Sequence, residues 1–193
     1  CKICSNKNTR TRRIVWMKII ICFPPKSGGN HLKNLLTVTK ENIDSYMSVY
    51  KGGKSAHSRM GHNLVEEDLL TDLMYGHFGE IMSYQKEIRK FTNKKFIMIS
   101  PDTYKDRKIL SERFAEPQLK LDSYHDHEQV FLYEPFMFHY YFGTKMKNIM
   151  NISVTELFND DINPVIDRIN YFISKDLARD QVNQLHKIWK SKN

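Results

Sequence analysis

The sequence predicts an α/β fold in which a mainly parallel central sheet is flanked by helices in three layers. Two continuous apolar runs, 17–23 and 95–100, have the pattern of strands that are buried on both faces of such a sheet. Segments with the apolar period of a helix follow both runs. With 193 residues the chain is long enough for one compact core and short for two, so we expect a single domain over 17–193.

The first strand, Met17–Phe23, is expected at the centre of the sheet because nearly all of its residues are apolar. The pair Pro24-Pro25 ends this strand, and Ser27–Gly29 permit a tight loop. Asn30 is then expected to cap a helix that runs through 31–36. A strand, a loop and a helix in this order are typical of a phosphate-binding loop.

The next part of the chain contains a loop, a strand and a helix. Residues 49–63 include three glycines and several basic side chains without apolar periodicity, so we expect a long loop of the kind that often forms a lid. The aromatic and apolar segment 74–82 predicts a strand that ends near His77. Residues 84–91 are then expected to be helical.

The run 95–100 is the second clear buried strand, and a helix is expected to follow it over 101–114. The aromatic segment 130–142 predicts a buried helix that is interrupted near Pro135, with a pair of strands as the alternative. For the helix over 101–114 we expect Ser100 or Asp102 as the cap and Ile109, Leu110 and Phe114 as the apolar stripe.

The last quarter of the chain predicts one strand and two helices. Residues 148–154 are expected to form the strand, and 155–158 open a turn. Pro164 begins the first helix, which has Val165, Ile166, Ile169 and Phe172 on one face. Residues 179–190 are expected to form the second.

The charge distribution does not favour a nucleic-acid surface. The net charge is +8, but residues 1–16 carry five basic residues and no acid, which leaves +3 for the rest. We therefore predict no nucleic-acid partner. No run of about 18 apolar residues and no hydrophobic signal core is present, so we expect no membrane segment and a cytoplasmic location.

Residues 1–16 are expected to lie outside the folded domain, as a disordered or non-native N-terminal extension, because the first strong strand begins only at Met17. Cys1 and Cys4 form a Cys-x-x-Cys pair in this segment. Zinc needs four ligands, and no second pair of ligands follows nearby. We therefore predict no metal site.

The loop Pro24–Gly29 has the chemistry of an anion site, because a helix N-terminus presents backbone N–H groups and a favourable dipole to one point. Glycine permits a close approach of backbone to ligand, and Lys26 adds a charge that can follow a transferred group. The ATP-binding pattern G-x-x-x-x-G-K-[ST] is absent. These features predict a P-loop NTPase-like domain that binds phosphate or sulfate, and an ordinary turn with an exposed lysine is the alternative.

Residues Phe23–Leu32 resemble the phosphate loop of the sulfotransferases, commonly Tyr-Pro-Lys-Ser-Gly-Thr-Thr-Trp-Leu. The resemblance implies a co-substrate, 3′-phosphoadenosine 5′-phosphosulfate, whose phosphosulfate end is held by residues 25–31. Since the hydroxyls of Thr-Thr are missing, Ser27 or Asn30 is expected to replace them. The matching residues are Pro25, Lys26, Ser27, Gly28 and Leu32, whereas Gly29, Asn30 and His31 replace Thr-Thr-Trp.

A second resemblance lies at the other end of the domain, where 149–158 and 166–173 look like the strand, Tyr-Glu-Asp-Leu turn and helix of that family. Family members hold the donor's 3′-phosphate with an Arg at the end of the strand after the loop and a Ser about two helical turns later. Here the strand 96–100 ends without Arg. Arg107 and Ser111, four residues apart on one helix face, are the expected substitutes, and a solvated helix face is the alternative.

His77 is the predicted general base. A His beside small residues at a strand end is accessible to a substrate, and its pKa suits neutral pH. The resemblance supports it, since family members carry a His or Glu base after the second strand. Glu80 is the reserve candidate, and a hydrogen-bonded structural His is the alternative.

Several other polar residues have more than one interpretation. His31, in the first turn of the loop helix, is expected either to touch donor or acceptor or to pack under the loop. His57, Arg59 and His62 suit an anionic acceptor or a solvated loop. The alternate spacing of residues 125–128, His-Asp-His-Glu, suits a metal, but a polar loop explains it more simply.

Together these observations predict a sulfotransferase that moves a sulfuryl group from 3′-phosphoadenosine 5′-phosphosulfate to a hydroxyl of a small-molecule or carbohydrate acceptor. Lys26 and the loop amides would stabilise the transferred group, and His77 would take the acceptor proton. Two alternatives remain: a catalytically silent nucleotide-binding module and a small P-loop kinase. The kinase would need Mg²⁺ ligands that the sequence does not place at the loop.

Overall fold

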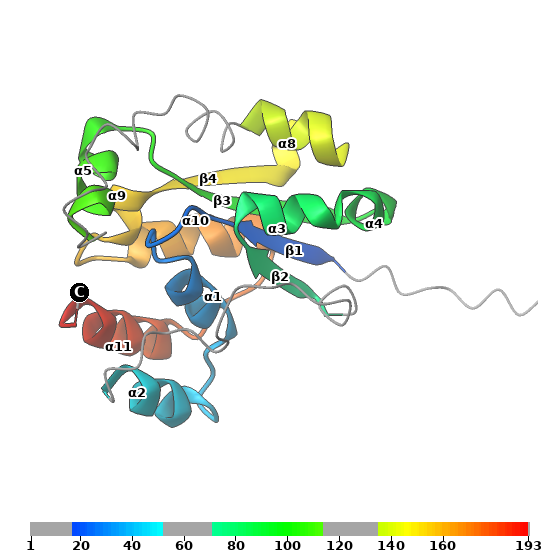
Figure 1. Cartoon of the computed structure of the whole chain (residues 1–193). Coiled ribbons are helices and arrows are strands. Elements are labelled where there is room, and N and C mark those ends of the chain that lie inside the picture. Colours follow the sequence, from blue (N-terminus) through cyan, green and yellow to red (C-terminus); the bar gives the residue numbers. More distant parts are fainter. Residues whose placement is uncertain (1–16, 52–70, 114–134, 193) are drawn as a thin grey trace, which may run out of the picture.

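The computed structural model describes residues 17–51, 71–113 and 135–192 (Figure 1). In this part of the chain four parallel strands form one sheet in the order β2-β1-β3-β4. The α/β fold with a parallel sheet flanked by helices is therefore confirmed. The strands are β1 (Lys18–Cys22), β2 (Leu73–Gly76), β3 (Lys94–Ser100) and β4 (Ile149–Ser153).

The direction in which the chain adds strands to the sheet reverses beside β1. The chain passes from β1 to β2 on one side and then to β3 on the other side of β1. In open parallel sheets the crevice for a ligand lies at such a reversal, outside the carboxyl ends of the strands. The segments that follow β1, β2 and β3 are therefore the ones in which a site is expected.

Alternate side chains of the strands build two separate cores. Ile21 and Ile97 face one core, and Ile20 and Phe96 face the other; all four are fully buried. The first core is covered by α1 (Gly29–Thr37), α2 (Ile43–Lys51), α10 (Asn163–Ile173) and α11 (Arg179–Lys190). The second is covered by α3 (Phe78–Ser83), α4 (Gln85–Lys90) and α8 (Pro135–Phe142).

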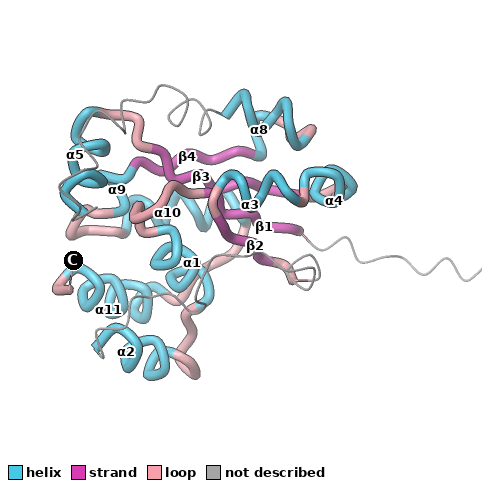
Figure 2. Tube along the Cα trace, viewed as in Figure 1, coloured by secondary structure: helices cyan, strands magenta, loops and turns pink. Residues whose placement is uncertain are grey.

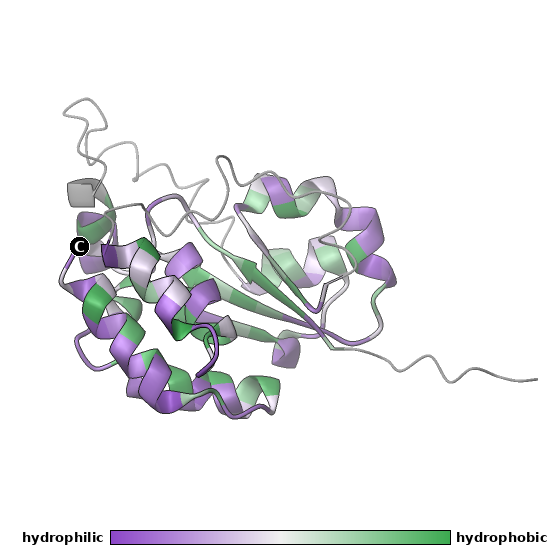
Figure 3. Cartoon of the chain, turned by 90° about the horizontal axis from the view of Figure 1, so that it is seen from below, coloured by the Kyte–Doolittle hydropathy of each residue, from purple (hydrophilic) through white to green (hydrophobic). Residues whose placement is uncertain are grey.

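The result is a sheet between two helical layers, as Figure 2 shows. Figure 3 shows hydrophobic residues along the strands and mixed hydrophobic and hydrophilic faces on the helices. Two further helices, α5 (Tyr104–Arg113) and α9 (Val154–Leu157), pack on each other at the carboxyl edge of the sheet, and a short 3₁₀ turn, η2 (Met146–Asn148), precedes β4. No helix in the described ranges is long and apolar enough to cross a membrane.

Some boundaries differ from the expected ones. The strand predicted within 74–82 ends at Gly76, next to His77 as expected. Residues 78–83, for which no element was predicted, form α3, because the Glu80 carboxylate accepts from the backbone N–H of His77 as in a capping box. The expected turn at 155–158 is a short helix with Ser153 as its cap.

The predicted caps of two helices also differ. Gly28, not Asn30, is the N-cap of α1, and Asn30 lies buried inside the helix. Thr103, rather than Ser100 or Asp102, caps α5 by exchanging hydrogen bonds with Asp106. Helix α2 was not predicted; its last residues, 49–51, fall at the start of the expected loop at 49–63, and the rest of that loop lies outside the described residues.

Candidate functional site

The loop between β1 and α1 is the expected phosphate loop. Its backbone turns sharply at two residues with positive φ, Lys26 at 62° and Gly28 at 89°. Between them, Ser27 donates to the Pro24 carbonyl from both its backbone N–H, at 3.3 Å, and its hydroxyl, at 2.7 Å. The Gly28 carbonyl then accepts the first hydrogen bond of α1 from Leu32, at 2.9 Å. The loop thereby brings the N-terminus of α1 to the carboxyl edge of the sheet.

Both glycines of this loop are required by close packing. A Cβ on Gly29 would lie 2.0 Å from the ring of Phe23. A Cβ on Gly28 would lie 2.9 Å from Leu157 and 3.3 Å from Trp189. The loop is therefore held against Phe23 and against α9 and α11, and no larger residue fits at either position without a shift of these neighbours.

The predicted loop residues fall into an exposed group and a buried group. Lys26 stands exposed at the tip. No acidic residue occupies the first turn of α1, whose N–H groups have no acceptor within the helix. This combination of a cation and a helix N-terminus favours an anion. Pro25 is exposed like Lys26, Gly28 is half-buried, and Ser27, Gly29, Asn30 and His31 are buried.

His77 follows β2 directly and is bonded to the same segment as the loop. Its Nδ1 lies 2.9 Å from the Phe23 carbonyl, which can only accept, so Nδ1 carries the proton. In the neutral form of the ring the lone pair is then on Nε2, the tautomer in which this nitrogen can accept a proton. The Phe23 and His77 rings also meet edge to face, with centroids 5.1 Å apart.

Glu80, the reserve candidate for the general base, has a structural role next to His77. One of its carboxylate oxygens accepts from the backbone N–H of His77 at 2.8 Å. Burial raises the pKa of Glu80, and the hydrogen bond from His77 opposes this shift. Its carboxylate thus holds the segment that carries the His77 ring.

Arg107 lies on α5 with part of its guanidinium group unsatisfied. Its Nε and the hydroxyl of Thr155 on α9 are buried without a hydrogen-bond partner in the part of the chain that the structure describes. The two helices are joined by the buried Asp106, whose carboxylate accepts from the backbone N–H of Thr155 at 2.6 Å. A buried N–H donor and a buried hydroxyl that both lack partners suit an oxyanion or an ordered water.

Sequence reasoning missed Thr155, as well as a polar group at the ends of β3 and β4. The Ser100 hydroxyl contacts the side chains of both Asp102 and Asn151, and Asn151 donates to Asp102 at 2.6 Å. Asp102 is exposed and lies just past the end of β3. A carboxylate therefore stands where the resembled family has an Arg, and the polar residues after the buried run 95–100 were the signal available in the sequence.

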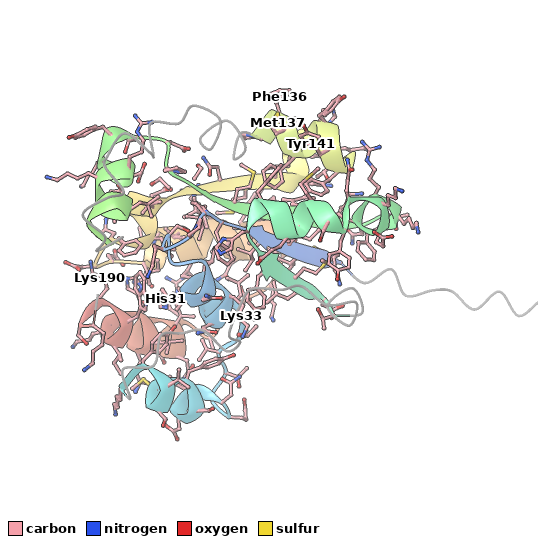
Figure 4. All side chains as sticks on the ribbon, viewed as in Figure 1. His31, Lys33, Phe136, Met137, Tyr141 and Lys190 are labelled. Carbon is pink, nitrogen blue, oxygen red and sulfur yellow. The ribbon has the colours of Figure 1, made fainter. Side chains whose placement is uncertain are left out.

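The His31 side chain points into the protein and away from the exposed tip of the loop. It is 1% exposed, and its ring lies 3.0 Å from the Tyr50 hydroxyl and 3.0 Å from His186 Nδ1. Figure 4 shows the His31 side chain between α1 and α11. Of the two interpretations of His31, the structure favours packing under the loop. The structure describes only the backbone of Ser111.

The structure brings most of the predicted groups to one edge of the sheet. The Phe23 carbonyl links His77 to the loop, and Gly28 packs on α9, which contacts α5 and thus adjoins Arg107. In Figure 1 the loop after β1, α5 and α9 lie at the same end of the strands. His57, Arg59, His62, residues 125–128 and the Cys1–Cys4 pair lie outside the described residues.

Within the described ranges, no group of three or more His, Cys, Asp or Glu side chains is placed to hold a metal ion. Comparison with known proteins gave no match to a family model, to a curated protein or to a solved structure.

Proposed function

We propose that this chain is a sulfotransferase that moves a sulfuryl group from 3′-phosphoadenosine 5′-phosphosulfate to a hydroxyl of an acceptor. The observation that carries the proposal is the joint placement of Lys26 and His77, which come from adjacent strands and are linked through the backbone of Phe23. A cation beside a helix N-terminus can bind the negatively charged sulfuryl oxygens. A base at the end of the neighbouring strand can take the proton of the acceptor hydroxyl.

In the proposed reaction the acceptor oxygen attacks the sulfur of the donor in line with the bond to the bridging oxygen. The new oxygen–sulfur bond forms as the old one breaks, and adenosine 3′,5′-bisphosphate leaves. His77 Nε2 takes the acceptor proton, while the Phe23 carbonyl holds the ring by Nδ1. Lys26 and the N–H groups at the start of α1 stabilise the negative charge of the sulfuryl oxygens.

The buried Nε of Arg107 on α5 and the hydroxyl of Thr155 on α9, which have no hydrogen-bond partner among the described residues, support a second anion contact at the junction of these helices. We assign the donor's 3′-phosphate to this pair, with Arg107 supplying charge and Thr155 a hydroxyl. Ser111 remains part of the proposal through its place one turn after Arg107 on α5.

The test of this function is single-turnover transfer of a labelled sulfuryl group from the donor to a panel of hydroxyl acceptors. His77→Ala should lower the transfer rate by about 10²- to 10⁴-fold, the usual contribution of a positioned base. It should bind adenosine 3′,5′-bisphosphate as the parent does, because the base faces the acceptor. Unaltered transfer in this variant would remove His77 from the mechanism.

A catalytically silent nucleotide-binding module is the second candidate, and two observations favour it. The Phe23 ring fills the space that a side chain at position 29 would take, so the family's first Thr hydroxyl has no equivalent. The Ser27 hydroxyl donates to Pro24 within the loop, so its proton is not directed to a ligand. Binding of the bisphosphate without transfer to any acceptor on the panel would select this candidate.

A further inference from the structure

A buried chain of hydrogen bonds runs beneath the phosphate loop and connects α1, α2 and α11. It joins the side chain of Asn34 to the Tyr50 hydroxyl at 3.0 Å, Tyr50 to His31 at 3.0 Å, and His31 to His186 at 3.0 Å. It ends at the Asn159 carbonyl, 2.7 Å from His186 Nε2. We call these five residues the imidazole chain.

The proton positions in the imidazole chain follow from its two ends. The Asn159 carbonyl can only accept, so His186 Nε2 donates and His186 Nδ1 accepts from His31 Nε2. The neutral His31 ring then accepts from Tyr50 at Nδ1, and Tyr50 accepts from the Asn34 amide. Each of the four ring nitrogens thus has one partner, for which it is either the donor or the acceptor, and both imidazoles are neutral.

This arrangement fixes the orientation of the His31 ring. His31 and His186 are 1% and 2% exposed, so water offers no alternative partners. Buried polar networks whose members are all satisfied tend to specify a single side-chain geometry. A rotation of either ring would leave a buried nitrogen without a partner.

The His31 ring in turn supports the loop through Trp189. The two rings stack with centroids 4.0 Å apart and planes 6° apart. The far edge of the indole, at Cζ2, lies 3.3 Å from the position of a Cβ on Gly28. Asn159 follows Phe158, which packs on Trp189 with ring centroids 4.7 Å apart. The imidazole chain therefore ends on the same structures that contact Gly28.

We propose that His186 is a positioning residue of the phosphate loop, which acts through His31 and Trp189 to hold Gly28 and the first turn of α1. This inference rests on the proposed function, because it gives α11 a part in shaping the donor site.

Two substitutions of His186 separate positioning from simple structural support. His186→Asn places an acceptor where Nδ1 lies and keeps the bond from His31, whereas His186→Gln places a donor where Nε2 lies and keeps the bond to Asn159. Each variant loses one hydrogen bond of the chain, so both should lose a similar amount of stability. Only the Gln variant frees the His31 ring.

The readout is the affinity for adenosine 3′,5′-bisphosphate, measured by calorimetry below the melting temperatures of all variants. We expect His186→Asn to stay within about twofold of the parent and His186→Gln to bind about tenfold more weakly, the equivalent of one hydrogen bond. Equal affinities in the two variants would overturn the inference. Trp189→Phe keeps the chain but removes the part of the indole nearest Gly28, and it should match His186→Gln; parent-like affinity in Trp189→Phe would also overturn the inference.

A measurement without ligand separates this inference from the proposed function. The Leu32 amide, which bonds to the Gly28 carbonyl at 2.9 Å, should exchange its hydrogen faster in His186→Gln than in His186→Asn. If the parent binds no nucleotide, the proposed function is wrong, but the positioning role of His186 is still tested by the exchange rate of the Leu32 amide. Equal exchange in the two variants would refute that role.

Discussion

Gly29, at the end of the loop between β1 and α1, lies directly against the ring of Phe23, so even the smallest side chain at this position would meet the ring. Gly29→Ala should destabilise the fold by about 1–3 kcal/mol, because the new methyl group would force the buried ring to move. Gly79→Ala is the matched control: a Cβ there meets nothing within 4 Å and lies in a helix, where Ala is favoured. Urea unfolding of both variants checks this, and equal stabilities would contradict the packing.

Lys26 combines a charge with a backbone conformation that L-residues rarely adopt, at a φ of 62°. Lys26→Ala and Lys26→Gly should both lose transfer activity, by about 10²- to 10³-fold if the charge acts like a single oxyanion donor. Lys26→Gly should be more stable than Lys26→Ala by about 1 kcal/mol, because glycine adopts this φ without strain. Kinetics and melting of the two variants test charge and strain separately; full activity in either would remove Lys26 from the mechanism.

Single residues differed in how far the sequence could predict them. The exposed tip at Lys26 and the place of His77 after a strand follow from local pattern, since a Pro pair and small residues mark the strand ends. The setting of His31 does not, because its partner His186 is 155 positions away. No local pattern in the sequence indicates which distant ring will meet a buried imidazole.

At the scale of elements, the contact between α1 and α11 should depend on pH. Burial, and then the neighbouring His186, lowers the pKa of His31. Burial also lowers the pKa of His186, as does Lys190, against the opposing effects of the Asn159 carbonyl, Asp160 and Asp161. Both rings are therefore neutral in the fold, whereas in the unfolded chain they take up protons below about pH 6.5.

Because the unfolded state binds more protons in this range, the free energy of unfolding should fall as the pH drops below about 6.5, and the loss should continue to the lowered pKa values of the fold. The measurement is urea unfolding of the parent and of His186→Gln between pH 8 and pH 5. The parent should lose more stability than the variant, which has one buried imidazole fewer. Parallel curves for the two proteins would contradict neutral burial of the pair.

Helices and strands were predicted best where their apolar pattern was continuous. The segments Lys94–Ser100 and Arg179–Lys190 form the expected strand and helix because each buries a regular set of apolar side chains. The strand that was expected to end near His77 does end at Gly76, but the helix after it, α3, was not predicted, because a capping interaction of Glu80 outweighs the β-propensity of its aromatic residues. Helix α9 was also not predicted, because it is only one turn long and is started by the Ser153–Glu156 capping box.

At the scale of the whole molecule, the parallel sheet follows from the buried strands that the sequence contains, and the reversal beside β1 places the loops after β1, β2 and β3 at one edge. The place of β1 inside the sheet was predicted and is confirmed, since β1 pairs with both β2 and β3. The full order of the strands could not be predicted, because apolar patterns do not specify which strands pair. The junction of α5 and α9, with its unsatisfied Arg107 and Thr155, depends on that order and was therefore also hidden.

We propose above all that the carboxyl edge of this sheet binds a nucleotide with phosphates at both the 3′ and 5′ positions. The most direct measurement is a calorimetric titration of the unmodified chain with adenosine 3′,5′-bisphosphate, adenosine 5′-phosphate and ATP with Mg²⁺. The account predicts the tightest binding for the bisphosphate, weaker binding for the 5′-phosphate because Arg107 and Thr155 lose their partner, and no preference for ATP. Preferential binding of ATP with Mg²⁺, or no binding of the bisphosphate, would contradict it.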